Sequence, residues 1–69
     1  MVDNNEMTQI INQCGQECGM SADELAPIIA GLNKDGYRTK AGLQDMARDN
    51  EWGDYNFPKA LKKKVEAVL

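Results

Sequence analysis

The stretch SADELAPIIAGL, residues 21–32, carries the signal that decides the fold. It begins with a capping box, in which the Ser21 hydroxyl accepts from the backbone N–H of Glu24 and the Glu24 carboxylate reaches back to Ser21. From Leu25 onward, apolar residues recur at steps of three and four, the spacing of one face of an α-helix. Pro27 lies one turn deeper than a first-turn proline, so we expect a kink or a helix that restarts there.

Three other segments have the same helical spacing of apolar residues. They contain Met7, Ile10, Ile11, Cys14 and Cys18; Leu43, Met46 and Ala47; and Leu61, Val65, Val68 and Leu69. Gly19 is a natural residue to end the first helix, Thr39 can cap the third, and Pro58 can start the last. No segment alternates like a strand. The sequence therefore predicts an all-α fold: a single compact four-helix domain, residues 1–69, with a helix-turn-helix-like pair at residues 22–50.

Glycines and aromatic residues refine this expectation. Gly36 should end the helix that starts after Ser21. Gly31 inside that helix costs up to ~1 kcal/mol relative to alanine, which is tolerable if another backbone packs closely against it. Residues 51–56 are expected to form an irregular connection whose Trp52 and Tyr55 close one end of the core.

Charge is divided unevenly along the chain, whose net charge is -3. All 8 basic residues lie between Lys34 and Lys64, whereas the first 33 residues contain acids only. Those acids are Asp3, Glu6, Glu17, Asp23 and Glu24. Such a division offers a partner two complementary electrostatic surfaces. It would also allow two copies of the chain to pair head to tail as a homodimer.

The leading functional hypothesis is therefore a small regulatory or inhibitory protein that acts by binding another protein, whose identity the sequence does not give. The expected contact surface is the solvent-exposed face of the last helix, opposite its apolar residues. It comprises Lys59, Lys62 and Lys63, with Lys64 at its boundary.

Catalysis and metal binding have little support. The chain has no histidine and only two cysteines. Four residues apart on a helix, Cys14 and Cys18 would have Cβ atoms about 5–6 Å apart, longer than the ~3.8 Å of a disulfide. A structural zinc site needs four ligands. We therefore expect two reduced cysteines that pack as small apolar side chains, no cofactor, and no enzymatic activity.

The expected location is the cytoplasm. Residues 2–6 have neither the basic nor the apolar part of a secretory signal, and no apolar run is long enough to span a membrane. No membrane interaction is expected either.

The segment LNKDGYRTKAG, residues 32–42, resembles the turn in the helix-turn-helix unit of the C-terminal recombinase domain of large serine recombinases. The resemblance implies an alternative function, DNA binding through residues 34–50, with the third helix in the major groove. The implied DNA-binding residues are Lys34, Arg38, Lys40, Gln44 and Arg48. Protein binding stays the first choice, because acids lie in the same segment and the isoelectric point of about 4.7 is low for a DNA-binding domain.

Overall fold

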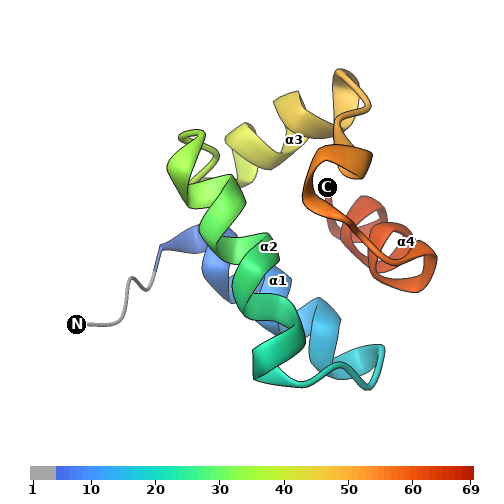
Figure 1. Cartoon of the computed structure of the whole chain (residues 1–69). Coiled ribbons are helices and arrows are strands. Elements are labelled where there is room, and N and C mark those ends of the chain that lie inside the picture. Colours follow the sequence, from blue (N-terminus) through green and yellow to red (C-terminus); the bar gives the residue numbers. More distant parts are fainter. Residues whose placement is uncertain (1–4) are drawn as a thin grey trace.

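The computed structural model describes residues 5–69, which form four α-helices and one short 3-10 helix (Figure 1). In chain order these are α1 (Glu6–Glu17), α2 (Ala22–Lys34), α3 (Lys40–Arg48), η1 (Trp52–Tyr55) and α4 (Lys59–Val68). No strand occurs among these residues. The predicted all-α class with four helices is confirmed. Asp3, which belongs to the acidic first half of the chain, lies outside the described residues.

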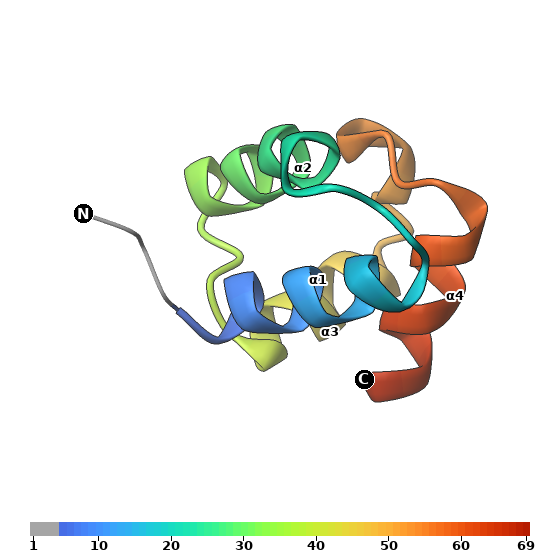
Figure 2. The same cartoon turned by 90° about the horizontal axis from the view of Figure 1, so that it is seen from below.

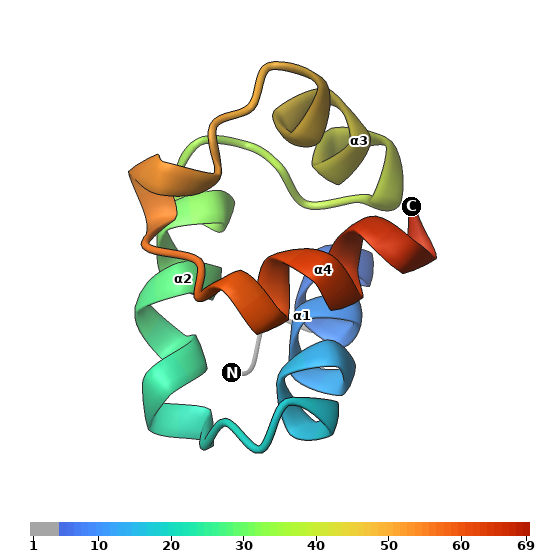
Figure 3. The same cartoon turned by 90° about the vertical axis from the view of Figure 1, so that its right-hand side faces the viewer.

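Helix α1 is the centre of the arrangement, since it contacts α2, α3 and α4. Helices α1 and α2 lie side by side and run in opposite directions, as Figure 3 shows. Helix α3 lies across one end of this pair, and α4 runs obliquely over one face of the pair, where it contacts α1 (Figures 1–3). Each of the other α-helices is thus held mainly by α1, and η1 is held by α2.

The buried side chains form one continuous cluster that draws on every helix. Its members are Met7, Ile11, Cys14, Leu25, Ile28, Leu32, Leu43, Met46, Trp52, Tyr55, Leu61 and Val65. Both aromatic residues of η1 belong to it, so the expectation that they close the core is confirmed. The Trp52 ring packs edge-on against Phe57, with 4.9 Å between centroids. Val68 is 46% exposed and does not join the core, whereas Val65 is buried and Leu69 packs against the core cluster, so the expected apolar stripe of α4 holds except at Val68.

The predicted helix ends are also confirmed. The Ser21 N–H donates to Glu24 Oε1 at 3.0 Å, and the Glu24 N–H donates to Ser21 Oγ at 3.3 Å. The Thr39 hydroxyl oxygen accepts from a backbone N–H in the first turn of α3 at 3.1 Å. Gly19 and Gly36 follow α1 and α2 with φ of 77° and 89°, a left-handed conformation that favours glycine.

We expect Ser21→Ala to cost ~1 kcal/mol of stability and to lower the melting temperature by about 4–8 °C. The hydroxyl is one of the groups that satisfy the first N–H groups of α2. Thermal unfolding followed by circular dichroism measures the change. Ser21→Thr, which keeps the hydroxyl, is the control and should retain most of the stability. An unchanged melting curve for the alanine variant would mean that the capping box does not stabilise the domain.

Two details of α2 differ from expectation. Of the two alternatives at Pro27, the restart is wrong, because α2 runs through Pro27 as one helix. Pro27 is exposed, so the backbone carbonyl of Asp23, which loses its helical donor, lies where water can reach it. The close neighbour of Gly31 is a side chain and not a backbone: a Cβ atom there would lie 2.9 Å from Cδ1 of Tyr55.

The two cysteines are free thiols on α1 and at its end. Cys14 is buried and Cys18 is half-buried. Burial raises the pKa of the Cys14 thiol, and the nearby Glu17 carboxylate raises it further. A thiol with a raised pKa is less often ionised and therefore reacts slowly. This placement agrees with cysteines that pack as apolar side chains.

Candidate binding surfaces

We call the four lysines Lys59, Lys62, Lys63 and Lys64 on α4 the lysine face. Leu61 and Val65 of the same helix are fully buried, which turns the lysines away from the core. Lys59 and Lys63 are exposed, and neither has an acidic partner within residues 5–69. These two cations are therefore available to another molecule.

The other two lysines make contacts within the fold. Lys62 Nζ lies 6.0 Å from the centroid of the Trp52 ring, within the range of a cation–π contact. Lys64 Nζ lies 3.5 Å from Glu17 Oε1 and joins α4 to α1. Both members of this ion pair are about half exposed, so it contributes little to stability. The predicted cluster of four is thus two free lysines beside two lysines that already have a contact.

The residues implied for DNA binding on α3 are mostly engaged. Gln44 Nε2 donates to the backbone carbonyl of Leu69 at 3.1 Å, which joins α3 to the end of α4. Arg48 Nη2 lies 3.1 Å from a carboxylate oxygen of Asp45. Lys40 is exposed at the start of the helix. Of the three, only the Lys40 side chain has no hydrogen bond or ion pair within residues 5–69.

The turn before α3 holds the other two implied residues. Arg38 Nε donates to the backbone oxygen of Asn33 at 3.2 Å and to its Oδ1 at 2.7 Å. The guanidinium group therefore folds back onto the end of α2. Lys34 is exposed in the last turn of α2.

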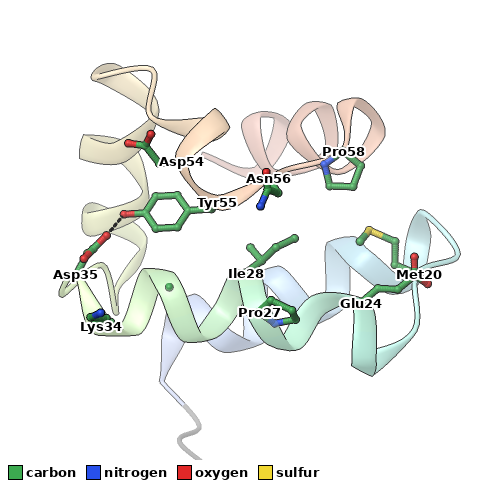
Figure 4. Close-up of a pocket in the computed structure, with 11 residues that line it drawn as sticks. Met20, Glu24, Pro27, Ile28, Lys34, Asp35, Asp54, Tyr55, Asn56 and Pro58 are labelled. Carbon is green, nitrogen blue, oxygen red and sulfur yellow. Dashed lines mark hydrogen bonds between the residues drawn. The ribbon is translucent and has the colours of Figure 1, made fainter.

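A groove with a volume of about 570 Å³ lies between α2 and the segment from η1 to the start of α4 (Figure 4). It is lined by Met20, Glu24, Pro27, Ile28, Gly31, Lys34, Asp35, Asp54, Tyr55, Asn56 and Pro58. Sequence analysis did not find this groove. Its walls come from residues 20–35 and residues 54–58, which are far apart in the sequence, and no local pattern indicates that they meet.

The groove has acidic residues towards both ends and apolar residues between them. In Figure 4, Glu24 lies near one end, and Asp35 and Asp54 lie towards the other. Between them, Pro27 and Ile28 of α2 form an apolar floor. Lys34 is the one basic residue of the lining. The lining therefore carries three acids and one base, which gives the groove a negative potential.

Tyr55 forms the wall at the Asp35 end. Its hydroxyl donates to Asp35 Oδ2, a bond that ties η1 to the end of α2. Burial raises the pKa of the Tyr55 hydroxyl above its ordinary value, and the hydrogen bond to Asp35 raises it further. The ring lies over Gly31, where any larger residue would collide with it. The glycine thus allows the aromatic wall to stand close to α2.

A second tyrosine–carboxylate bond lies next to this wall. The Tyr37 hydroxyl donates to Glu51 Oε2 at 2.7 Å, and the rings of Tyr37 and Tyr55 meet edge-on. The hydrogen bond to Glu51 raises the pKa of Tyr37 from 10.0 to about 12, with smaller contributions from desolvation and from nearby carboxylates.

The raised pKa of Tyr37 predicts a loss of stability at alkaline pH. Because the pKa is higher in the folded chain, the contribution is complete below about pH 10 and is lost as the pH rises through about 12. Tyr37→Phe should therefore be less stable than the wild type at pH 8, and the difference should shrink above about pH 10. Urea unfolding of both proteins across this range checks it. A constant difference would contradict the assignment.

No protein-family model, curated protein or solved structure matches this chain. Within residues 5–69, none of the helices combines the length and the apolar character needed to cross a bilayer.

Proposed function

We propose that this chain is a non-catalytic, small regulatory or inhibitory protein that binds another protein through the lysine face of α4. The observation that carries the proposal is that Lys59 and Lys63 are exposed and unpaired within residues 5–69. Both side chains are exposed on a well-packed helix, and no acid within residues 5–69 pairs with them. Exposed cations on a rigid element attract an acidic surface and speed its association.

The other two lysines support the same surface. Lys62 lies over the Trp52 ring and Lys64 lies beside Glu17, so both positive charges stay on the same helix as the two free ones. The surface that we propose therefore combines two free charges with two that already have a contact within the fold, and its partner is a protein with a complementary acidic patch.

The test compares two charge-reversed proteins of equal net charge. Lys59→Glu with Lys63→Glu removes the free charges of α4, and Lys34→Glu with Lys40→Glu removes two exposed lysines elsewhere. Each protein is immobilised and exposed to lysate of the native host, and captured proteins are quantified. We expect a partner that the wild type and the second variant retain and the first variant loses. Equal capture by all three would contradict the proposal, provided that circular dichroism shows intact folds.

DNA binding is the second candidate, because residues 32–42 resemble a helix-turn-helix turn and two exposed lysines, Lys34 and Lys40, lie within that stretch. In this case duplex DNA should cause saturable NMR shifts in α3 that weaken steeply with salt. Lys34→Glu with Lys40→Glu should abolish them, whereas Lys59→Glu with Lys63→Glu should not. DNA shifts of this kind would favour this candidate over the lysine face.

A further inference from the structure

We propose that the groove between α2 and η1 binds an extended, basic segment of another protein, in which an apolar side chain lies between two Lys or Arg residues. This site is distinct from the lysine face and does not depend on it. The lysine face attracts acids, whereas the groove presents acids. The two surfaces therefore select ligands of opposite charge.

The carboxylates of the groove still have oxygen atoms free to accept hydrogen bonds from a cationic group. Glu24 uses Oε1 in the capping box and Asp35 uses Oδ2 for Tyr55, so each has a second oxygen with no hydrogen bond within residues 5–69. The Asp54 side chain is exposed and has no ion pair within the same residues. A carboxylate can accept from guanidinium or ammonium groups in short, charge-assisted hydrogen bonds.

The floor of the groove provides the apolar part of the recognition. Ile28 is 4% exposed and belongs to the buried core, so its position at the floor of the groove is fixed by packing. Pro27 and Pro58 are exposed, and Met20 is half-buried at the end near Glu24. An apolar ligand side chain placed here would cover these groups and remove apolar surface from water. Methionine adapts to the shape of such a ligand.

The length of the groove sets the spacing of the ligand. Glu24 and Asp35 are eleven positions apart along α2, which corresponds to about 16 Å at a rise of about 1.5 Å per residue. In an extended segment, positions i, i+2 and i+4 point to the same side, and i and i+4 are about 13 Å apart. Arg and Lys side chains are long enough to cover the difference. The pattern Arg-x-Leu-x-Arg therefore fits both acidic ends and the apolar floor.

The probe for this site is a blocked, fluorescein-labelled peptide, Gly-Arg-Ser-Leu-Ser-Arg-Gly. We expect saturable binding, measured by fluorescence anisotropy, that weakens as sodium chloride rises from about 20 to about 200 mM. Amide NMR shifts should centre on Gly31, Asp35 and Asn56. The peptide Gly-Glu-Ser-Leu-Ser-Glu-Gly should not bind, and one with the leucine moved to the end should bind more weakly. Shifts centred elsewhere, or no binding by the arginine peptide, would overturn the proposal.

Matched variants separate the groove from general charge. Glu24→Gln with Asp54→Asn removes two groove acids, and glutamine keeps the capping box. Asp23→Asn with Glu66→Gln removes the same two residue types outside the groove lining. The first pair should weaken binding by about tenfold and the second by less than about twofold. Equal losses from both pairs would overturn the proposal.

A second copy of the chain is the competing occupant. If raising the protein concentration without peptide produced the same groove shifts together with a dimer in sedimentation, the groove would be a self-association site and the proposal would be wrong. Peptide binding to a protein that sediments as a monomer supports it. Lys59→Glu with Lys63→Glu should still bind the peptide, which keeps this result independent of the lysine face.

Discussion

Replacing Trp52 with alanine is expected to leave most of the protein unfolded at room temperature. Removing a large buried aromatic side chain costs about 3–5 kcal/mol, and a core of this size supplies little more than that. Trp52 is 5% exposed, and its loss would also remove the contacts that its ring makes with Phe57 and Lys62. Circular dichroism and urea unfolding measure the folded fraction.

Trp52→Phe is the control for this prediction. It keeps a ring that can meet Phe57 edge-on, so it should lose only part of the stability and stay folded. Lys62→Ala removes the cation above the ring and should cost less than about 1 kcal/mol. A Trp52→Ala protein as stable as the Trp52→Phe protein would show that η1 does not close the core.

The second large effect is expected at Gly15, where α1 meets α2. A Cβ atom there would lie 2.4 Å from Cδ1 of Leu25, a side chain that is itself 2% exposed and has no room to move away. We expect Gly15→Val to cost about 3 kcal/mol, the upper part of the range for overpacked cores. Gly53→Ala is the matched control, since a Cβ atom there meets nothing within 4 Å, and it should change stability little.

A double variant identifies the cause of this loss. If the collision with Leu25 destabilises Gly15→Val, then adding Leu25→Ala should cost much less in that background than in the wild type. Urea unfolding of the four proteins gives the coupling energy. Strictly additive losses would mean that the valine acts through helix propensity and not through the contact between the helices.

The helix ends could be predicted because their signals are local. Ser21 with Glu24, Thr39, and the glycines at 19 and 36 act on N–H and carbonyl groups a few residues away, so sequence spacing is sufficient. Pro27 shows the limit of such rules. Whether a proline interrupts a helix depends on what surrounds the carbonyl that loses its donor, and that carbonyl lies here on an exposed face of α2.

The binding surfaces could be predicted only in part. The exposure of Lys59 and Lys63 follows from the spacing of Leu61 and Val65 on one helix. The hydrogen bond from the Gln44 side chain to the Leu69 carbonyl could not be predicted, because it depends on where the end of α4 meets α3. The groove was missed for the same reason. The Tyr55 ring over Gly31 and its bond to Asp35 join segments that only the tertiary fold brings together.

The hydrogen bonds between the starts of α1 and α3 bear on the order in which the helices form. The Met7 N–H donates to the Arg38 carbonyl at 3.1 Å, and Glu6 Oε1 accepts from the Lys40 N–H at 2.6 Å, so α1 and α3 complete each other's first turns. Helices α1 and α2 can pair early through contacts close in sequence, whereas α3 gains this bond only after α1 has docked. The short α3 should therefore consolidate late. Hydrogen exchange at Lys40 would report each opening of that junction, and Glu6→Gln would speed it.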